Sequence, residues 1–442
     1  LRDQGVTKIL HVFVEDQKHK SHRDEAIEWC LKHTGVEVLD WNRLDIDSAT
    51  ITNAAAGVRD LTLHCSGNNA VLRSWLSPKG LVELENVKLT NPARREWIQC
   101  MEKSADFVRG YREDMEEEED DPEKHPPRVK VALIDDGVDG LNADLSRIIA
   151  AGQTFSKREK HQYNSHFKHY NSYFKSTRGH GTIMAMLIRK ICPNVRLYVA
   201  KLNEEKTGRN SFSITAESAV KAIWWAIEHE VHIISMSWTI SQPSDAGTIQ
   251  NLVKAINEAV ERGILIFCSV SNQGPHDGGM YPASCNRSNS FLIGTATISG
   301  QAWRWNGANE VDYILPGTDL EVRIGDELFD SRLQNLCESG SELATALASG
   351  LAALIMDCVA LNDAAELERM RDRAHMKVKM AFDSINTWYN KRDDDKYLRV
   401  WDTFGQALKD DMLHLADGYD HVCEKLLIFF LSKRGSLGQS YR

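Results

Sequence analysis

The chain has 442 residues, of which 42% are hydrophobic and 26% charged, the composition of a soluble globular protein with two or three domains. Its formal net charge of −10 argues against nonspecific nucleic-acid binding, which favours a basic surface. No nucleic-acid partner is therefore expected.

Cysteine usage and hydropathy bear on the compartment. The nine cysteines are an odd number, are scattered and contain no C-x-x-C pair. This usage fits a reducing compartment better than a disulfide framework, so a cytoplasmic, intracellular location is expected. No apolar run approaches the roughly 20 residues that span a bilayer, and none of the partners is expected to be a membrane. The chain starts at Leu1, so the lack of a signal peptide is only suggestive.

Residues 1–112 alternate between strand-like and helix-like segments. Apolar runs predict strands at residues 9–14, 36–41, 61–65 and 82–89, and a capped amphipathic helix at residues 21–31. This alternation predicts a small N-terminal α/β domain with parallel strands. Its Ser-Gly-Asn-Asn cluster at 66–69 is interpreted as a turn, with a binding loop as the lesser alternative.

An acidic run occupies residues 113–121 and is followed by Pro122, Pro126 and Pro127. Blocks of like charge repel one another and stay solvated. Residues 113–127 are therefore predicted to form an exposed linker, with an acidic interaction patch as the alternative.

Residues 128–360 contain repeated strand–helix–strand units. Strands are predicted at 129–134, 195–200, 231–236 and 264–269, and long helices at 214–230 and 248–262. Such units predict an α/β fold with a parallel sheet and helices on both faces. Ligand sites in these sheets lie at the carboxyl ends of the strands, where Asp135, Ser237 and Asn272 fall. Residues 361–442 are predicted to form a helical C-terminal extension, with helices at 366–382 and 400–415.

Four short motifs follow one another along this second region. Asp135 precedes Asp-Gly, His180 lies in His-Gly-Thr-x-Met-Ala, and Asn272 lies in Asn-x-Gly. Residues 340–354 then read Gly-Ser-Glu-Leu-Ala-Thr-Ala and continue as a helix whose small residues recur every four positions. Taken singly each motif is more often structural, but their joint order is specific.

Residues 128–360 resemble the peptidase domain of the subtilisin family of serine peptidases, and look most like intracellular fungal members with a non-prodomain α/β region in front. The resemblance implies that Asp135 is the triad acid and His180 the general base. It implies that the Asn272 amide helps to hold the oxyanion. It also implies two walls that clamp an extended substrate through the backbone, formed by Ser235, Met236, Ser237, Trp238, Ser269, Val270 and Ser271.

The nucleophile position of the family motif is occupied by Glu342. A carboxylate has no hydroxyl for His180 to activate. Ser341 can cap the helix, but one residue along a helix is about 100° of rotation, so its hydroxyl should point away from His180. Arg178, two residues before His180, is a second departure that could crowd or charge the site.

Three hypotheses follow from these residues. The first is a disabled peptidase fold that binds extended polypeptides or a regulatory protein partner. The second is an active intracellular serine endopeptidase, and the third is a scaffold for the flanking regions. No cofactor or metal is expected, because the histidines at 161, 166 and 169 share their loop with no Cys or carboxylate at ligand spacing and are interpreted as a solvated loop.

Overall fold

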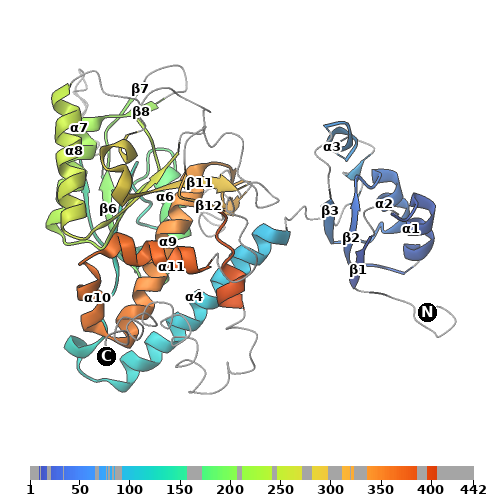
Figure 1. Ribbon diagram of the computed structural model, residues 1–442, viewed down its shortest axis with the longest axis horizontal. Helices are drawn as coiled ribbons and strands as arrows, with labels where there is room; N and C mark the ends of the chain where they lie inside the picture. Colours follow the sequence, from blue (N-terminus) through green and yellow to red (C-terminus); the bar gives the residue numbers. More distant parts are fainter. Residues whose placement is uncertain are drawn as a thin grey trace, which may run out of the picture. The chain divides into compact units, whose positions relative to one another are not determined.

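The protein is described from a computed structural model (Figure 1). The structure describes residues 9, 11–16, 21–32, 34–64, 69–75, 77, 80, 81, 84, 92–156, 172–206, 212–240, 246–270, 281–296, 311–318, 320–322, 336–385 and 396–405. Contacts divide the chain into two compact units, Leu1–Arg95 and Glu96–Arg442, and each is described by itself.

The first unit is a small α/β domain with a three-stranded parallel sheet, in the order β1-β2-β3. Its elements are β1 (His11–Glu15), α1 (Asp24–Leu31), β2 (Val38–Leu44), α2 (Ser48–Ala54), β3 (Asp60–His64) and α3 (Asn69–Trp75). Alternate residues of β2, such as Leu39 and Trp41, are buried against the helices, as expected for a sheet with one covered face. The predicted parallel α/β unit is therefore present. The expected fourth strand at 82–89 and the Ser-Gly-Asn turn at 66–68 lie almost wholly outside the described residues.

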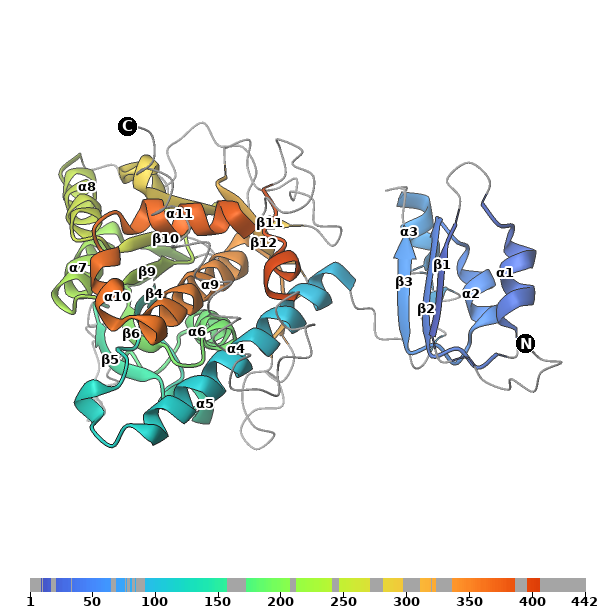
Figure 2. The same cartoon turned by 60° about the horizontal axis from the view of Figure 1, so that its bottom comes forward.

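The second unit is built on a seven-stranded sheet in the order β12-β11-β10-β9-β4-β6-β5 (Figure 2). Every strand pair in it is parallel. The strands are β4 (Lys130–Asp135), β5 (Ile149–Thr154), β6 (Arg196–Lys201), β9 (Ile233–Met236), β10 (Leu265–Ser269), β11 (Ser290–Ala296) and β12 (Tyr313–Pro316). Short two-stranded sheets are formed by β7 (Glu204–Lys206) with β8 (Phe212–Ile214) and by β13 (Leu320–Val322) with β14 (Leu336–Glu338). The α/β class predicted from the sequence is confirmed.

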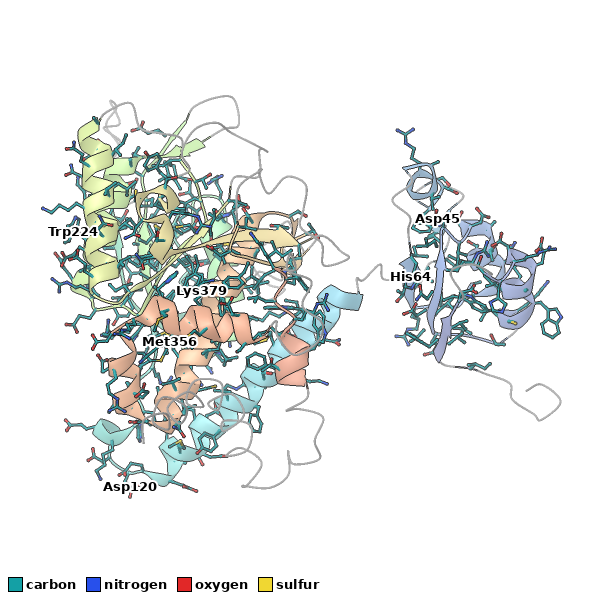
Figure 3. All side chains as sticks on the ribbon, in the orientation of Figure 1. Asp45, His64, Asp120, Trp224, Met356 and Lys379 are labelled. Carbon is teal, nitrogen blue, oxygen red and sulfur yellow. The ribbon has the colours of Figure 1, made fainter. Side chains whose placement is uncertain are left out.

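Helices cover both faces of this sheet. α6 (His180–Ile191) packs along α9 (Ser341–Asn362) on one face, and α7 (Ala216–Glu228) packs along α8 (Ala246–Glu261) on the other. Side chains fill the space between the layers (Figure 3). The short helix α5 (Ala143–Ser146) and the 3-10 turns at Pro122–Lys124, Ala283–Cys285 and Arg287–Asn289 connect these layers.

The central helix α9 is buried along nearly its whole length. Gly350 brings it close to α6, because a Cβ at this position would lie 2.9 Å from the Ile191 side chain. Among the described helices, α9 alone is long and apolar enough to span a bilayer, but its apolar window is entirely buried inside the unit, as in the core helix of a globular protein. The expectation that no apolar run approaches that length was wrong: Ser, Thr and Gly interrupt the stretch, but its many Ala and Leu residues still make it apolar on average.

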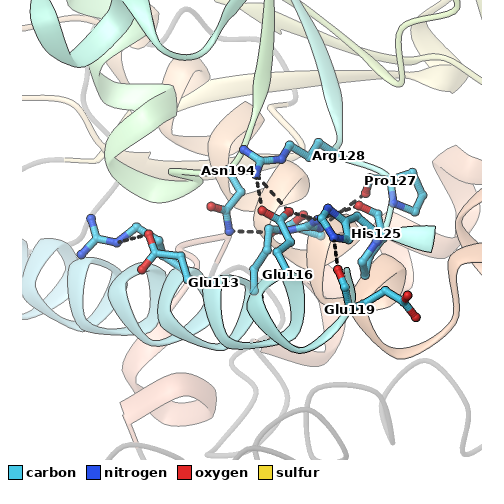
Figure 4. A network of polar contacts seen from close by, with 11 residues as sticks. Glu113, Glu116, Glu119, His125, Pro127, Arg128 and Asn194 are labelled. Atoms are coloured by element: carbon cyan, nitrogen blue, oxygen red, sulfur yellow. Dashed lines mark hydrogen bonds and ion pairs between the residues drawn. The ribbon is translucent and has the colours of Figure 1, made fainter. Parts of the chain in front are cut away.

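The acidic segment after residue 112 is not the predicted linker. It continues the long helix α4 (Pro92–Glu118), and Trp97, Met101 and Val108 of this helix belong to the core of the second unit. Glu116 accepts hydrogen bonds from the Arg128 guanidinium at 2.8 and 3.0 Å (Figure 4). A cation that follows the 3-10 turn at Pro122–Lys124 thus offsets part of the negative charge of the acidic run. The boundary between the units therefore lies near Arg95 rather than at residue 112.

A buried ion pair fastens α4 to α9. The Arg112 guanidinium is fully buried and donates to Asp357 Oδ1 at 2.6 Å and to the Pro126 carbonyl at 2.7 Å. Asn194 donates to the other Asp357 oxygen at 3.2 Å. Burial raises the pKa of Asp357, and the charge and hydrogen bond of Arg112 oppose that shift. Together, Arg112, Asn194 and Asp357 therefore join three segments that are far apart in the sequence.

The predicted boundary at residue 360 is also wrong. α9 runs to Asn362, and α10 (Ala364–Met370) and α11 (Ala374–Ile385) pack onto the same core through apolar side chains such as Leu367 and Phe382. The single helix expected at 366–382 is interrupted at Arg373, whose φ of 72° is left-handed. Of the helix expected at 400–415, the structure describes a π-helical turn at Trp401–Gly405.

Candidate active site

Asp135 and His180 meet at the carboxyl edge of the sheet. Asp135 is the last residue of β4 and His180 is the first residue of α6. His180 Nδ1 lies 2.8 Å from Asp135 Oδ1, with the two side chains 22% and 4% exposed. This hydrogen bond fixes the orientation of the ring and leaves Nε2 for another partner. The expectation that these two side chains lie together agrees with the structure.

Two glycines flanking His180 permit this arrangement. Gly179 precedes the helix with φ of 85°, a left-handed conformation that suits glycine. A Cβ at Gly181 would lie 2.2 Å from the Gly137 carbonyl oxygen and 3.2 Å from Asp135 Cβ. The start of α6 can therefore approach the end of β4 closely only because position 181 has no side chain.

Asp136 holds the loop before His180 and was not singled out in the sequence. Its carboxylate accepts hydrogen bonds from Ser176 Oγ at 2.7 Å, Arg178 N at 2.7 Å and Gly181 N at 2.8 Å. These bonds join both sides of His180 to the residue after Asp135. The only signal in the sequence was the second acid of Asp-Asp-Gly, because the donors that Asp136 binds lie some 40 residues away.

Arg178 is paired with an acidic side chain. Its guanidinium donates to Glu204 Oε1 at 2.6 Å, and the Glu204 side chain is 8% exposed. Burial raises the pKa of Glu204, an effect that Arg178 opposes and that the charges of Asp136 and Asp135 reinforce. The positive charge that seemed able to disturb the site is therefore offset by a carboxylate that the sequence did not identify.

Glu342 lies in the first turn of α9, beside the start of the helix. A negative charge there is stabilised by the helix dipole. The expected cap from Ser341 is not formed. Ser341 is itself the first residue of the helix, is fully buried, and donates its hydroxyl to the Val270 carbonyl at 2.6 Å. Ser341 is thus committed to Val270, consistent with the prediction that its hydroxyl points away from His180.

His180 is surrounded by negative charge. Burial alone would lower its pKa, but the charge and hydrogen bond of Asp135 and the charges of Glu342 and Asp136 outweigh this effect. Together they raise the pKa of His180 to about 9. The ring is therefore an imidazolium at neutral pH and has no lone pair with which to accept a proton.

We expect an NMR titration of histidine-labelled protein to show His180 titrating near pH 9, far above the reference value of about 6.5. The linked stabilisation should be complete below about pH 6.5 and lost as the pH rises through about 9, since the folded protein holds this proton more tightly. The His180→Ala variant assigns the signal.

A second histidine provides the internal control. Burial, together with the charges of Arg371 and Lys130, lowers the pKa of His232 to about 3, so its ring should remain neutral throughout the titration. A His180 signal that titrates near 6.5 would contradict the proposed carboxylate surroundings.

The predicted substrate walls are only partly in position. Ser235 and Met236 lie inside β9, between β4 and β10, and the Ser235 hydroxyl accepts a hydrogen bond from Ser349. In the second wall, Ser269 ends β10, where it pairs with β11. The Val270 N–H donates to the Ile293 carbonyl, and the Val270 carbonyl accepts a hydrogen bond from the Ser341 hydroxyl. The backbone groups of these wall residues therefore form hydrogen bonds within the fold, because a central strand of a sheet pairs with a neighbour on each side.

Two wall residues, Ser237 and Trp238, lie just beyond the end of β9. The Trp238 indole donates to the Ile134 carbonyl at 2.6 Å, which anchors it to the strand that bears Asp135. Ser271 and Asn272 lie outside the described residues, as do His161, His166 and His169. Within the described part of the chain, no group of three or more His, Cys, Asp or Glu residues could hold a metal ion.

Comparison with known proteins agrees with this arrangement. The "Major intracellular serine protease" of Bacillus subtilis is 26% identical over 238 residues, covering 51% of this chain and 68% of that protein. The "Subtilisin-like protease het-Q2" of Podospora anserina is 27% identical over 292 residues, covering 58% and 76%.

A solved structure has a similar fold. The "Epidermin Leader Peptide Processing Serine Protease (EpiP) from Staphylococcus aureus" matches with a TM-score of 0.50 at 17% identity, over 65% of this chain and 77% of that one. Residues 127–387, more than half of the chain, match the subtilase family, Peptidase_S8. The second unit, with Asp135 and His180 at the carboxyl edge of its parallel sheet, is the part that matches, and the chain belongs to the subtilase family.

Proposed function

We propose that this subtilase is a peptidase-fold protein that binds an extended polypeptide without cleaving it. The observation that supports the proposal is the carboxylate of Glu342 in the first turn of α9, close enough to His180 for its charge to raise the pKa of the ring. The sequence motif predicts that this residue occupies the position of the family's nucleophile.

Two steps of serine-peptidase chemistry lack a group. Glu342 offers no hydroxyl to attack a carbonyl, and a protonated His180 cannot act as a general base. Loss of the nucleophile from a subtilisin-type triad lowers kcat about 10⁶-fold, and leaves about 10³–10⁴ over water. Ser341 cannot substitute, because its buried hydroxyl is bonded to Val270.

Groups suited to binding remain at the strand ends. The hydroxyls of Ser237 and Ser269 are buried and have no hydrogen-bond partner within the described structure. Both lie at the carboxyl edge of the parallel sheet, where ligand sites of such sheets form. An extended polypeptide, either a peptide ligand or a segment of a regulatory protein partner, is the ligand that the family relationship supports. The relatives' names support an intracellular location.

The alternative function is that of an active serine endopeptidase. The Asp135–His180 hydrogen bond and the Asp136 contacts that hold the loop support it, because this part of the machinery is intact. The missing hydroxyl weighs against it.

The test is binding without turnover. A fluorescently labelled unstructured polypeptide, such as a casein fragment, should show saturable anisotropy with the full chain, and mass spectrometry should recover it intact after prolonged incubation. Progressive cleavage that His180→Ala abolishes would establish the endopeptidase instead. No binding to any unstructured polypeptide tested would overturn the binding proposal.

Glu342 should also contribute to stability. Glu342→Gln keeps the shape but removes the charge that faces the helix start and His180. We expect its unfolding free energy to fall by about 1–2 kcal/mol at pH 7, measured by chemical denaturation.

Glu217→Gln is the matched control, since Glu217 is also a first-turn acid, on α7, but is 57% exposed. It should change stability by roughly 0.5 kcal/mol or less. If Glu342→Gln is as stable as the parent, the carboxylate is not held by the helix start and His180.

A further inference from the structure

Glu342 is the accessible carboxylate of the candidate active site. Every other residue of α9 is buried except Asn362 at the far end of the helix. The Asp135 side chain is 4% exposed and Asp136 is 3% exposed, so these two carboxylates offer almost no surface to a bound molecule. The His180 side chain is 22% exposed. A molecule that enters the site therefore meets Glu342 and His180 rather than the two aspartates.

The carboxylates around His180 outnumber the cations that offset them. The charges of Asp135, Asp136 and Glu342 all act on the His180 ring. Within the described structure, the cations among these groups are the His180 ring itself and the Lys201 ammonium, which lies near Asp136. The second Asp135 oxygen accepts no hydrogen bond from a described residue, so no further donor offsets its charge. One negative charge therefore remains, and Glu342 is the carboxylate through which a ligand can reach it.

The size of Glu342 limits how a polypeptide can lie in the site. A serine at the nucleophile position meets a backbone carbonyl in the middle of a bound chain. The glutamate side chain is larger than that of serine by a methylene group and a carboxylate, and its charge repels a carbonyl oxygen. A chain that begins at this point offers an α-ammonium instead, which is largely protonated at about pH 7 and has three N–H donors. The site therefore suits the start of a chain better than its middle.

We propose that Glu342 binds the N-terminal ammonium of a polypeptide whose chain begins in the site and extends along the carboxyl edge of the main sheet. This inference rests on the proposed polypeptide binding and specifies the ligand. A carboxylate can accept several hydrogen bonds at once, so Glu342 can bind the ammonium and remain beside the start of α9. Capture of a terminal amine is a recurring mode of peptide recognition.

One unstructured peptide with a fluorophore at its C-terminus is the probe, and anisotropy with the full chain is the measurement. The peptide is made with a free N-terminus, with a methylated N-terminus that keeps the positive charge, and with an acetylated N-terminus that lacks it. The free and methylated forms should bind about tenfold more tightly than the acetylated form, because a hydrogen bond between charged groups contributes on this scale.

A fourth peptide separates the two sources of an ammonium. It is acetylated and has a lysine as its first residue, so its only added cation is on a side chain. We expect it to bind as weakly as the other acetylated form. Binding as tight as that of the free N-terminus would mean that Glu342 accepts any ammonium, which contradicts the assignment to a chain end.

Two variants and a coupling reaction locate the contact. Glu342→Gln should bind the free and acetylated peptides with affinities within about twofold of each other, because the amide has no charge. Glu217→Gln, which removes an exposed first-turn acid on α7, should keep the tenfold difference. A carbodiimide joins a carboxylate to an amine that touches it. It should couple the free N-terminus to Glu342, as located by peptide mass spectrometry.

The proposal is wrong if the acetylated peptide binds as tightly as the free one, or if Glu342→Gln keeps the difference between them. It is also wrong if the carbodiimide couples the N-terminus to other carboxylates but not to Glu342. Each of these results leaves the proposed polypeptide binding intact. If no form of the peptide binds, the proposed function fails together with this inference.

Discussion

Replacing Glu342 with serine should convert a silent protein into a detectable peptidase. The substitution supplies the missing hydroxyl and removes one carboxylate from the surroundings of His180, so the pKa of the ring should fall toward a value suited to a general base. Asp135 already orients the ring. Because the nucleophile is worth about 10⁶ in kcat, we expect hydrolysis of an unstructured protein to rise at least about 10³-fold, measured by release of labelled peptides.

Two variants control this experiment. Glu342→Ala removes the same carboxylate without adding a hydroxyl and should remain silent. Glu342→Ser combined with His180→Ala should lose the gained activity. If Glu342→Ser is as silent as the parent, then another feature, such as the Arg178–Glu204 pair, has also disabled the site.

Breaking the buried pair between α4 and α9 should have the largest effect on stability. Arg112→Ala leaves the Asp357 carboxylate buried without its cation, and should lower the unfolding free energy by about 3–5 kcal/mol. Denaturant unfolding followed by the tryptophan fluorescence of the second unit measures this loss.

Arg109→Ala is the matched control on the same helix. Arg109 is 44% exposed and pairs with the exposed carboxylates of Asp106 and Glu113, so its removal should cost about 1 kcal/mol or less. Replacing both buried charges, by Arg112→Met with Asp357→Leu, should recover much of the loss. Equal effects of Arg112→Ala and Arg109→Ala would mean that α4 is not fastened through Asp357.

The sequence predicted the sheet where its strands were short, continuous apolar runs. The strands β4, β6, β9 and β10 were located within two residues, because central parallel strands are buried on both faces. β5 has Ala-Ala-Gly at its centre, which weakens its apolar signal, and the edge strand β12 is only four residues long and ends in proline. They were missed for these reasons, and β11 was overlooked although it is wholly buried.

The errors in the domain boundaries came from long-range pairing. Considered alone, the acidic run after residue 112 is typical of a solvated segment. In the structure its first part continues α4, where Glu116 pairs with Arg128 and the preceding Arg112 binds Asp357, 245 residues away in the sequence. Local charge patterns contain no information about partners at that separation. For the same reason, the sequence did not indicate that Glu204 pairs with Arg178.

At the site, motif order located Asp135, His180 and Glu342, but not the groups that support them. The role of Asp136 depends on three donors between residues 176 and 181, and these become neighbours only when α6 closes against β4. Asn272 lies outside the described residues, so its role as oxyanion donor remains a prediction.

The central claim is that the chain lacks an activated nucleophile, and a fluorophosphonate serine probe tests it most directly. The unmodified full chain should remain unlabelled, while Glu342→Ser, treated in parallel, should be labelled at position 342, as located by peptide mass spectrometry. Labelling of the unmodified chain at Ser341, or at any serine beside His180, with loss of that label in His180→Ala, would contradict the account.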